Sequence, residues 1–255
     1  VPENAALFDA LISAAIPDPA VPVIPLPLEN VLGVFERVTG HPEWRHFELF
    51  APGGPRYEGR AEVEPVVRMM AQVGNYDYAI DWVFTQRGSI RVDVSLTGID
   101  AAKGVPSVHL DDATAEHDTR FRTLVAPHLA AINHSHHFNF RLDLDIDGRK
   151  NRFLLGELET KFLRRKSSPR RSIWTLHEHV MQRERDLAIH HHKHGAGHAH
   201  WRISSSETRN AFGYPTSYVL ESHAHGEPLL HPDDYARAGF IAQPVWVTAY
   251  DPDEL

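Results

Sequence analysis

Alternation of apolar and polar residues, the pattern of a half-buried β-strand, recurs along much of this chain. Ile80, Trp82 and Phe84 occupy every second position, and the alternation resumes between Ile90 and Leu96. The intervening Gln86-Arg87-Gly88 has the composition of a tight turn. This arrangement predicts a β-hairpin that ends near Thr97-Gly98.

The clearest alternation follows His134-Ser135-His136. The apolar members are Phe138, Phe140, Leu142, Leu144 and Ile146, and the polar members are Asn139, Arg141, Asp143, Asp145 and Asp147. Gly148 ends the run. We therefore expect a strand over residues 134–147.

Other segments give weaker signals. The proline-rich run 21–28 predicts an extended edge segment, because proline lacks the N–H that a helix or a central strand needs. Residues 5–15 fit a short helix or a buried strand. Nine arginines and lysines in 149–171 favour a solvated basic loop, and Trp246-Val247-Thr248 is typical of a last strand.

Because few segments have a helical period, the sequence predicts an all-β protein, a large antiparallel β-sandwich. A chain of 255 residues can form one large domain. We expect a single domain over 1–255, with a histidine-rich loop at 186–200 inside it.

Composition narrows the chemistry. The 26 basic and 34 acidic residues give a net charge of −8, which argues against a nucleic-acid partner. No apolar run is long enough for a transmembrane helix, and the first residues do not resemble a signal peptide, so we expect a cytoplasmic protein without a membrane partner. Cysteine is absent and histidine occurs 19 times. A transition metal would therefore be bound by imidazole and carboxylate.

His134 and His136 are the first candidate metal ligands. On one strand they share a face with Phe138, about 6.5–7 Å apart along the chain. Two imidazoles at that spacing can bind one ion, and a pair of hydrogen-bonded core histidines is the other reading.

Asp143, Asp145 and Asp147 lie on the opposite face of the same expected strand. Three carboxylates so close together repel one another unless they are solvated or bind a cation. Oxygen ligands suit a hard ion such as calcium, and a wet acidic face explains the pattern equally well.

The tract His190–His200 is a further candidate. Its glycines and its lysine favour a disordered polar loop, and its imidazoles could also bind or deliver a metal.

The order of these features resembles the catalytic domain of the copper-containing primary amine oxidases. Gly74-Asn75-Tyr76-Asp77-Tyr78 leads into the expected hairpin, which ends at Leu96-Thr97-Gly98-Ile99, and Asn133-His134-Ser135-His136 follows. The resemblance continues through Trp201-Arg202-Ile203 and Gly239-Phe240-Ile241 to Trp246-Val247-Thr248, so it covers nearly the whole chain.

The resemblance implies a role for each of the following residues. Tyr76 matches the tyrosine that becomes topaquinone, with Asn75 and Asp77 flanking it. His134 and His136 match two copper(II) ligands. Asp143, the Leu144 carbonyl and Asp145 match ligands of a second cation, calcium or manganese. The implied reaction converts a primary amine and dioxygen into an aldehyde, ammonia and hydrogen peroxide, on a β-sandwich that dimerises.

The chain also departs from the family. Gln72 stands where threonine or serine is usual, and neither the catalytic aspartate nor the third copper histidine has a match. We therefore expect the cofactor-bearing subunit of a split oxidase, in a hetero-oligomer whose partner subunit supplies both residues. Three local substitutes for the third ligand stay open: His223-Ala224-His225, His177-Glu178-His179 and the histidine tract.

Two readings other than a split oxidase stay open. One is a catalytically inactive structural or metal-binding subunit of the same fold, and the other is an unrelated histidine-rich metal-storage protein. The sequence does not identify the amine.

Overall fold

The computed structural model describes residues 6–13, 25–164, 169–186, 199–222, 231 and 239–248, with side chains described from residue 31 onward. The chain divides into two compact units, residues 1–134 and 135–255. Each unit is described by itself.

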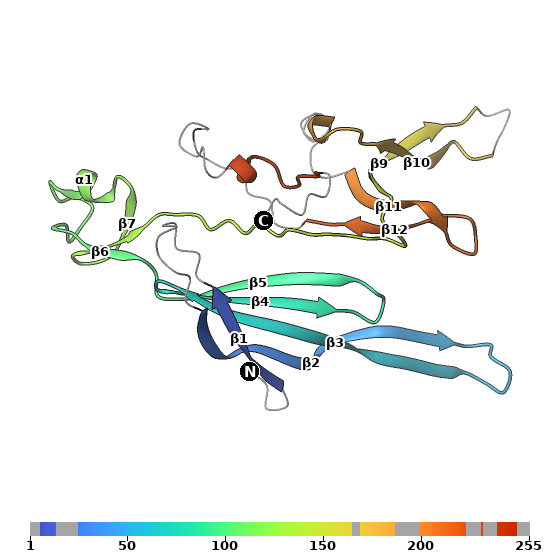
Figure 1. The fold of residues 1–255 in the computed structure, drawn as a ribbon, viewed down its shortest axis with the longest axis horizontal. Helices are drawn as coiled ribbons and strands as arrows, with labels where there is room; N and C mark the ends of the chain where they lie inside the picture. Colours follow the sequence, from blue (N-terminus) through green and yellow to red (C-terminus); the bar gives the residue numbers. More distant parts are fainter. Residues whose placement is uncertain are drawn as a thin grey trace. The chain divides into compact units, whose positions relative to one another are not determined.

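A five-stranded antiparallel sheet dominates the first unit (Figure 1). Its strands lie side by side in chain order: β1 (Ala6–Ser13), β2 (Pro25–Glu48), β3 (Arg56–Val73), β4 (Tyr76–Phe84) and β5 (Ile90–Gly98). The β4–β5 pair confirms the hairpin expected from the sequence, and Gly88 adopts a φ of 84° in its turn. The open choice between helix and strand for residues 5–15 is resolved as strand β1.

The proline-rich segment has the edge character expected of it. Pro25 and Pro27 pair with β1, whereas pairing of β2 with β3 starts only at Leu32. A proline without an N–H is tolerated where one side of the strand has no ladder. Residues 21–24 lie outside the described part of the chain.

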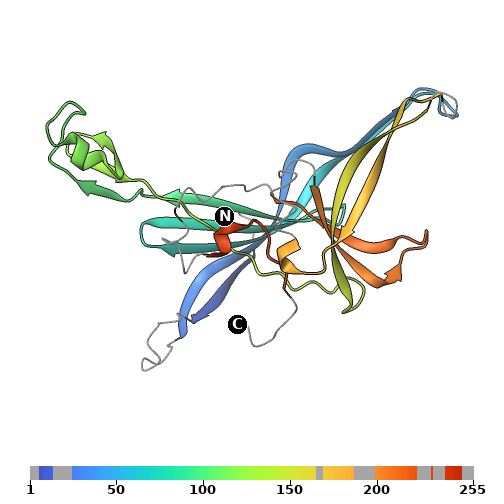
Figure 2. The ribbon, with the colours of Figure 1, turned by 90° about the horizontal axis from the view of Figure 1, so that it is seen from above.

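Strands β2 and β3 continue past the rest of the sheet as a two-stranded ribbon. Their register shifts between Val38 and Trp44, and Gly40 takes a φ of 81° there. Such irregularities bend a strand pair and increase its twist. The bend and the twist of the sheet are visible in Figures 1 and 2.

One face of this sheet combines apolar and ionic rows. Phe35, Val66 and Val83 are cross-strand neighbours and form a buried cluster. Two residues along β3 from Val66, Glu64 is 1% exposed and accepts hydrogen bonds from Arg37. On the other side of the cluster, Arg68 forms a bidentate pair with Asp81, with distances of 2.6 and 2.7 Å.

A smaller three-stranded sheet completes the first unit. It contains β6 (Ala102–Gly104), β7 (Arg122–Ala126) and β8 (Leu129–Ile132) in the order β6-β8-β7, with the short helix α1 (Ala115–Thr119). Asp118 of α1 accepts hydrogen bonds from the backbone N–H and the hydroxyl of buried Ser107. The Ser107 hydroxyl lowers the pKa of the Asp118 carboxyl, because it stabilises the charged form.

The second unit contains a four-stranded antiparallel sheet. Its strands are β9 (Asn151–Phe162), β10 (Ser172–Val180), β11 (Ala199–Arg209) and β12 (Pro215–Leu220), in the order β10-β9-β11-β12, and a short 3₁₀ helix η2 (Gly239–Ala242) follows. Phe153, Leu155 and Trp201 form its buried core, against which Val245 and Val247 pack.

The expected solvated basic loop at 149–171 is wrong for most of its length. Residues Asn151–Phe162 form β9, in which Phe153, Leu154 and Leu155 are buried. The basic side chains lie among these apolar residues, so the count of charges concealed a central strand. Residues 165–168 lie outside the described part.

The expected strand over 134–147 is also wrong. No strand is assigned between Asn133 and Lys150. Its apolar row is not a dry face either: Phe138, Phe140, Leu142 and Leu144 are 37–45% exposed, and only Ile146 is buried. Trp246–Thr248, expected as a last strand, also has no strand assigned.

The all-β prediction is confirmed, since antiparallel sheets make up most of the described chain. Of the expected histidine-rich loop at 186–200, residues 187–198 lie outside the described part, and Ala199 and His200 already belong to β11. Within the described residues, no helix is long and apolar enough to cross a membrane.

Candidate functional site

Tyr76 is the first residue of β4 and follows a tight turn. Gly74 adopts a φ of 62° in that turn, a backbone conformation that glycine takes without steric cost. The turn reverses the chain, so that β4 runs antiparallel to β3. Tyr76 pairs with Val73 of β3 on one side and with Gly98 of β5 on the other. The tyrosine is therefore held between two strands at the end of the sheet.

Three groups of the same unit surround the Tyr76 hydroxyl. His134 Nε2 lies 2.8 Å from Oη, and the Asp100 carboxylate lies 3.3 Å from it. The backbone N–H of Ala101 donates a hydrogen bond of 2.9 Å to the same oxygen. The phenol oxygen is thus fixed by one donor and has two acceptors within reach of its single proton.

The tautomer of His134 follows from its other nitrogen. Nδ1 lies 2.6 Å from the carbonyl oxygen of Ile132, the last residue of β8. A carbonyl can only accept, so Nδ1 carries the proton and Nε2 of the neutral ring presents its lone pair to Tyr76. A histidine fixed in this way, with Nδ1–H on a backbone carbonyl, has the orientation of a metal ligand.

Gly98 makes the close approach around Tyr76 possible. Its φ is +106°, and a Cβ atom there would lie 2.4 Å from the Asn75 carbonyl oxygen and 3.0 Å from the Tyr76 Cα. The Asn75 carbonyl accepts a hydrogen bond of 2.8 Å from the N–H of Ile99. Only glycine leaves room for this backbone arrangement.

Gly98→Ala is expected to destabilise the first unit by about 2–3 kcal/mol, because backbone strain and a backbone clash act together. Gly88→Ala is the matched control: its φ is +84°, but nothing lies within 4 Å of the added Cβ. The control should lose only about 1 kcal/mol, the cost of the strained conformation. Urea unfolding measures both, and equal losses would contradict a steric role for Gly98.

The other sequence-predicted residues lie at different distances from this cluster. Tyr78 shares a face with Tyr76, with ring centroids 6.5 Å apart. Asp77 pairs with Thr97 of β5. His136 follows His134 by two residues and is half-buried, whereas Asp143 and Asp145 are exposed on the segment that forms no strand.

Sequence reasoning missed two residues of this cluster, Asp100 and Ala101. They lie two and three residues after Gly98, where the expected hairpin ends. Within the described ranges, no three histidine, aspartate or glutamate side chains are placed to hold one ion. The structure thus joins the expected cofactor tyrosine to one expected copper ligand. It shows no third.

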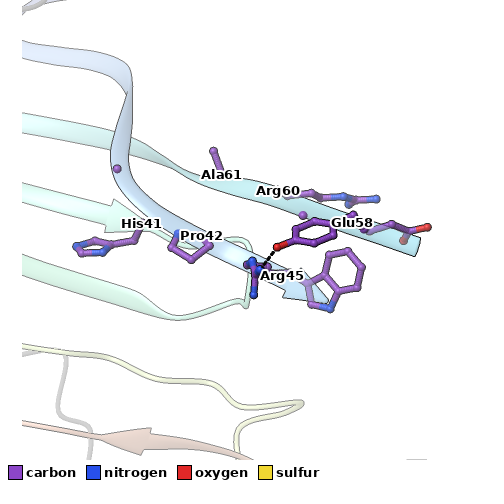
Figure 3. A pocket seen from close by; sticks show the side chains of 10 residues that line it. His41, Pro42, Arg45, Glu58, Arg60 and Ala61 are labelled. Carbon is purple, nitrogen blue, oxygen red and sulfur yellow. Dashed lines mark hydrogen bonds between the residues drawn. The ribbon is translucent and has the colours of Figure 1, made fainter. Parts of the chain in front are cut away.

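A shallow hollow lies elsewhere on the first unit, at the bend of the β2–β3 ribbon (Figure 3). It measures about 460 Å³, and its lining includes His41, Arg45 and Tyr57. Arg45 donates to the Tyr57 hydroxyl across it. Tyr57–Ala61 pair with the part of β2 beyond the bend, whereas Tyr76 lies opposite Val73 at the other end of β3. The hollow is therefore not part of the Tyr76 cluster.

Comparison with known proteins identifies the family of the chain. The family described as "Copper amine oxidase, enzyme domain" matches residues 13–255. A peroxisomal copper-containing amine oxidase, alpha 2, of Arabidopsis thaliana is 35% identical over 257 residues, which are 100% of this chain and 36% of that protein. A primary amine oxidase of Klebsiella aerogenes is 34% identical over 261 residues, which are 99% of this chain and 32% of that protein.

Solved structures agree on the fold. The crystal structure of a copper-containing benzylamine oxidase from Hansenula polymorpha superimposes with a TM-score of 0.74 and 23% identity. The match covers 98% of this chain and 37% of that one, so the chain spans well under half the length of the relatives it matches. With a family match across residues 13–255, the chain belongs to the copper amine oxidase enzyme-domain family.

Proposed function

We propose that this chain carries the cofactor of a primary amine oxidase, with Tyr76 as the precursor of topaquinone. The proposed activity is the oxidation of a primary amine by dioxygen to an aldehyde, with release of ammonia and hydrogen peroxide. The observation that carries the proposal is the 2.8 Å contact between Tyr76 Oη and His134 Nε2, which unites the two residues that such a site needs.

The residues present fit a copper ion. His134 Nε2 has the ligand tautomer, because Nδ1–H is bound to the Ile132 carbonyl. His136, two residues further on, is the second proposed ligand, and imidazole is a suitable donor for copper(II). When bound, copper would supply Lewis acidity and one-electron chemistry towards dioxygen beside the phenol.

The chain's own groups prepare the tyrosine for modification. The Ala101 N–H points at the phenol oxygen, so it stabilises negative charge there. Asp100 Oδ1 lies 3.3 Å from the phenol oxygen. It is the acceptor that can take the phenol proton when a bound copper ion would occupy the lone pair of His134 Nε2. Asn75 and Asp77 flank the ring and are proposed to fix its orientation.

The finer details of the proposal concern donors beyond the His134–His136 pair. Two imidazoles leave a copper ion short of ligands, and the described part of the chain offers no third donor beside them. We propose that a partner subunit supplies this ligand and the carboxylate base that removes the substrate's α-proton. His223 and His225, expected as one local substitute, lie outside the described residues.

Asp143, the Leu144 carbonyl and Asp145 are proposed ligands of calcium or manganese, since all three offer hard oxygen donors.

Peptide mass spectrometry after copper loading in air tests the central proposal. The peptide with Tyr76 should gain the mass of an oxidised ring, and Tyr78, on the same strand face, should stay unmodified. Tyr76→Phe should remove the modification completely, and Tyr78→Phe should leave it in place. An unmodified Tyr76 in protein shown to contain copper would favour the alternative of an inactive structural subunit.

A further inference from the structure

A second group of metal-binding side chains lies in the four-stranded sheet of the second unit. His177 and His179 are two residues apart on β10 and therefore point to the same face. Glu157 of β9 is the direct cross-strand partner of His177. These three residues come from two hydrogen-bonded strands, so the sheet itself fixes their spacing.

The two imidazoles are already as close as ligands of one ion. His177 Nδ1 lies 2.8 Å from His179 Nε2, and their ring centroids are 4.4 Å apart. Nitrogens that bind one ion at about 2.0–2.1 Å lie roughly 3 Å from each other. The rings must exchange their mutual hydrogen bond for the ion by turning both lone pairs toward it, and Glu157 Oε2 lies 3.5 Å from His179 Nε2.

The surroundings of the carboxylate favour a cation. The Glu157 side chain is only 14% exposed, and that of His179 is 34% exposed. Leu155, two residues before Glu157 on the same face, belongs to the buried core with Trp201. A carboxylate at the edge of an apolar core is partly desolvated, so a bound cation would stabilise its charged form.

We propose that His177, His179 and Glu157 bind a divalent transition-metal ion of the zinc class. The imidazoles provide two ligands. Glu157 does not yet converge with them, and it becomes the third ligand by rotating its carboxylate toward the pair. Water completes a four-coordinate site. This site uses none of the residues around Tyr76, and it does not depend on the proposed oxidase function.

The test uses a background chain from which other imidazoles that could bind zinc are removed. In this background chain His134 is replaced by alanine, and five histidines of the tract are replaced by asparagine: His190, His191, His192, His194 and His198. Zinc affinity is measured by competition with a chromophoric chelator. Cobalt(II) replaces zinc in a parallel titration, because its visible absorption reports four-coordinate geometry.

One equivalent of zinc is expected to bind the background chain. His177→Ala and His179→Ala should each weaken this binding at least about tenfold, and Glu157→Gln should remove the four-coordinate cobalt spectrum. His200→Ala is the matched control: this exposed histidine of β11 pairs with Gly156 and so lies on the other face from Glu157. It should leave zinc affinity unchanged.

Circular dichroism decides whether each variant remains folded. If folded His177→Ala and His179→Ala variants retain the zinc affinity of the background, the proposal is wrong. The contact at 2.8 Å is then a hydrogen bond between two neutral rings. The proposal is equally overturned if the background chain binds no zinc.

Discussion

Copper retention by the chain is expected to be lost when His134 is replaced by alanine, and quinone formation at Tyr76 with it. The variant removes the nitrogen that lies 2.8 Å from the Tyr76 hydroxyl, and an alanine offers no donor in its place. Removing a direct ligand should weaken copper binding more than the roughly 10–100-fold typical of losing an outer hydrogen bond. His136→Ala should behave in the same way.

His137→Ala is the control for these two variants. His137 is exposed and directly follows His136, but it has no assigned role at the site. After dialysis, atomic absorption should find as much copper in His137→Ala as in the chain without substitutions. A redox-cycling stain should mark the quinone of this variant. Unchanged copper stoichiometry in both His134→Ala and His136→Ala would contradict the copper site proposed here.

Glu64→Gln is expected to have the largest effect on the stability of the first unit. Glu64 is 1% exposed and binds both Arg37, at 2.8 Å, and Arg91, at 3.0 Å. Without the Glu64 carboxylate, Arg37 and Arg91 keep only more distant or more exposed carboxylates, chiefly Asp93, beside the buried cluster of Phe35 and Val66. Breaking a buried ion pair on one side costs about 3–5 kcal/mol. We expect about 3 kcal/mol, because both arginines are partly exposed.

The pH dependence gives an independent check. Burial raises the pKa of the Glu64 carboxyl, but the hydrogen bonds from Arg37 and Arg91 together lower it by more. The pKa therefore lies below its ordinary value of 4.5. A lowered pKa means that the stabilisation is complete above the pKa of the unfolded chain and disappears as pH falls through the folded value. The difference between the unmodified chain and Glu64→Gln should therefore be constant near neutral pH and shrink below about pH 4.5.

Chemical denaturation at several pH values measures this difference. Glu36→Gln serves as the control, since Glu36 is exposed on β2, adjacent to Arg37. It should change the free energy of unfolding by no more than about 0.5 kcal/mol. A Glu64→Gln loss as small as that of the control would show that the two ion pairs contribute little.

Local pattern predicted those parts of the fold in which strand neighbours are also neighbours in sequence. The hairpin β4–β5 was found because its turn, at Gln86–Gly88, connects two alternating runs directly. Such a pair needs no information from the rest of the chain.

Pattern failed where pairing depends on distant residues. The run 134–147 alternates well, but alternation alone does not supply the pairing that a strand needs, and no strand is assigned there. Conversely, β9 is central because β11, about 50 residues later, pairs with it. Its basic residues obscured that role.

The candidate site could be predicted only in part, because motifs mark some of its residues and tertiary structure alone brings the others close. Tyr76 and His134 were recognised from motifs that resemble one family. Asp100 and Ala101 carry no motif and reach the phenol only because Gly98 lets the chain turn tightly past Asn75. Such a contact depends on backbone geometry, which composition and spacing do not encode.

Strand register would decide which tyrosine is modified in the proposed reaction. Tyr76 and Tyr78 are chemically identical and share one face of β4. Sliding β4 by two residues would put Tyr78 in the place of Tyr76 without changing any side chain's face. The turn at Gly74 and the close approach at Gly98 oppose that slide, because each accepts only one alignment of the strands. If Tyr76 is oxidised as proposed, Gly74 and Gly98 thus select it over Tyr78 by fixing the register of β4.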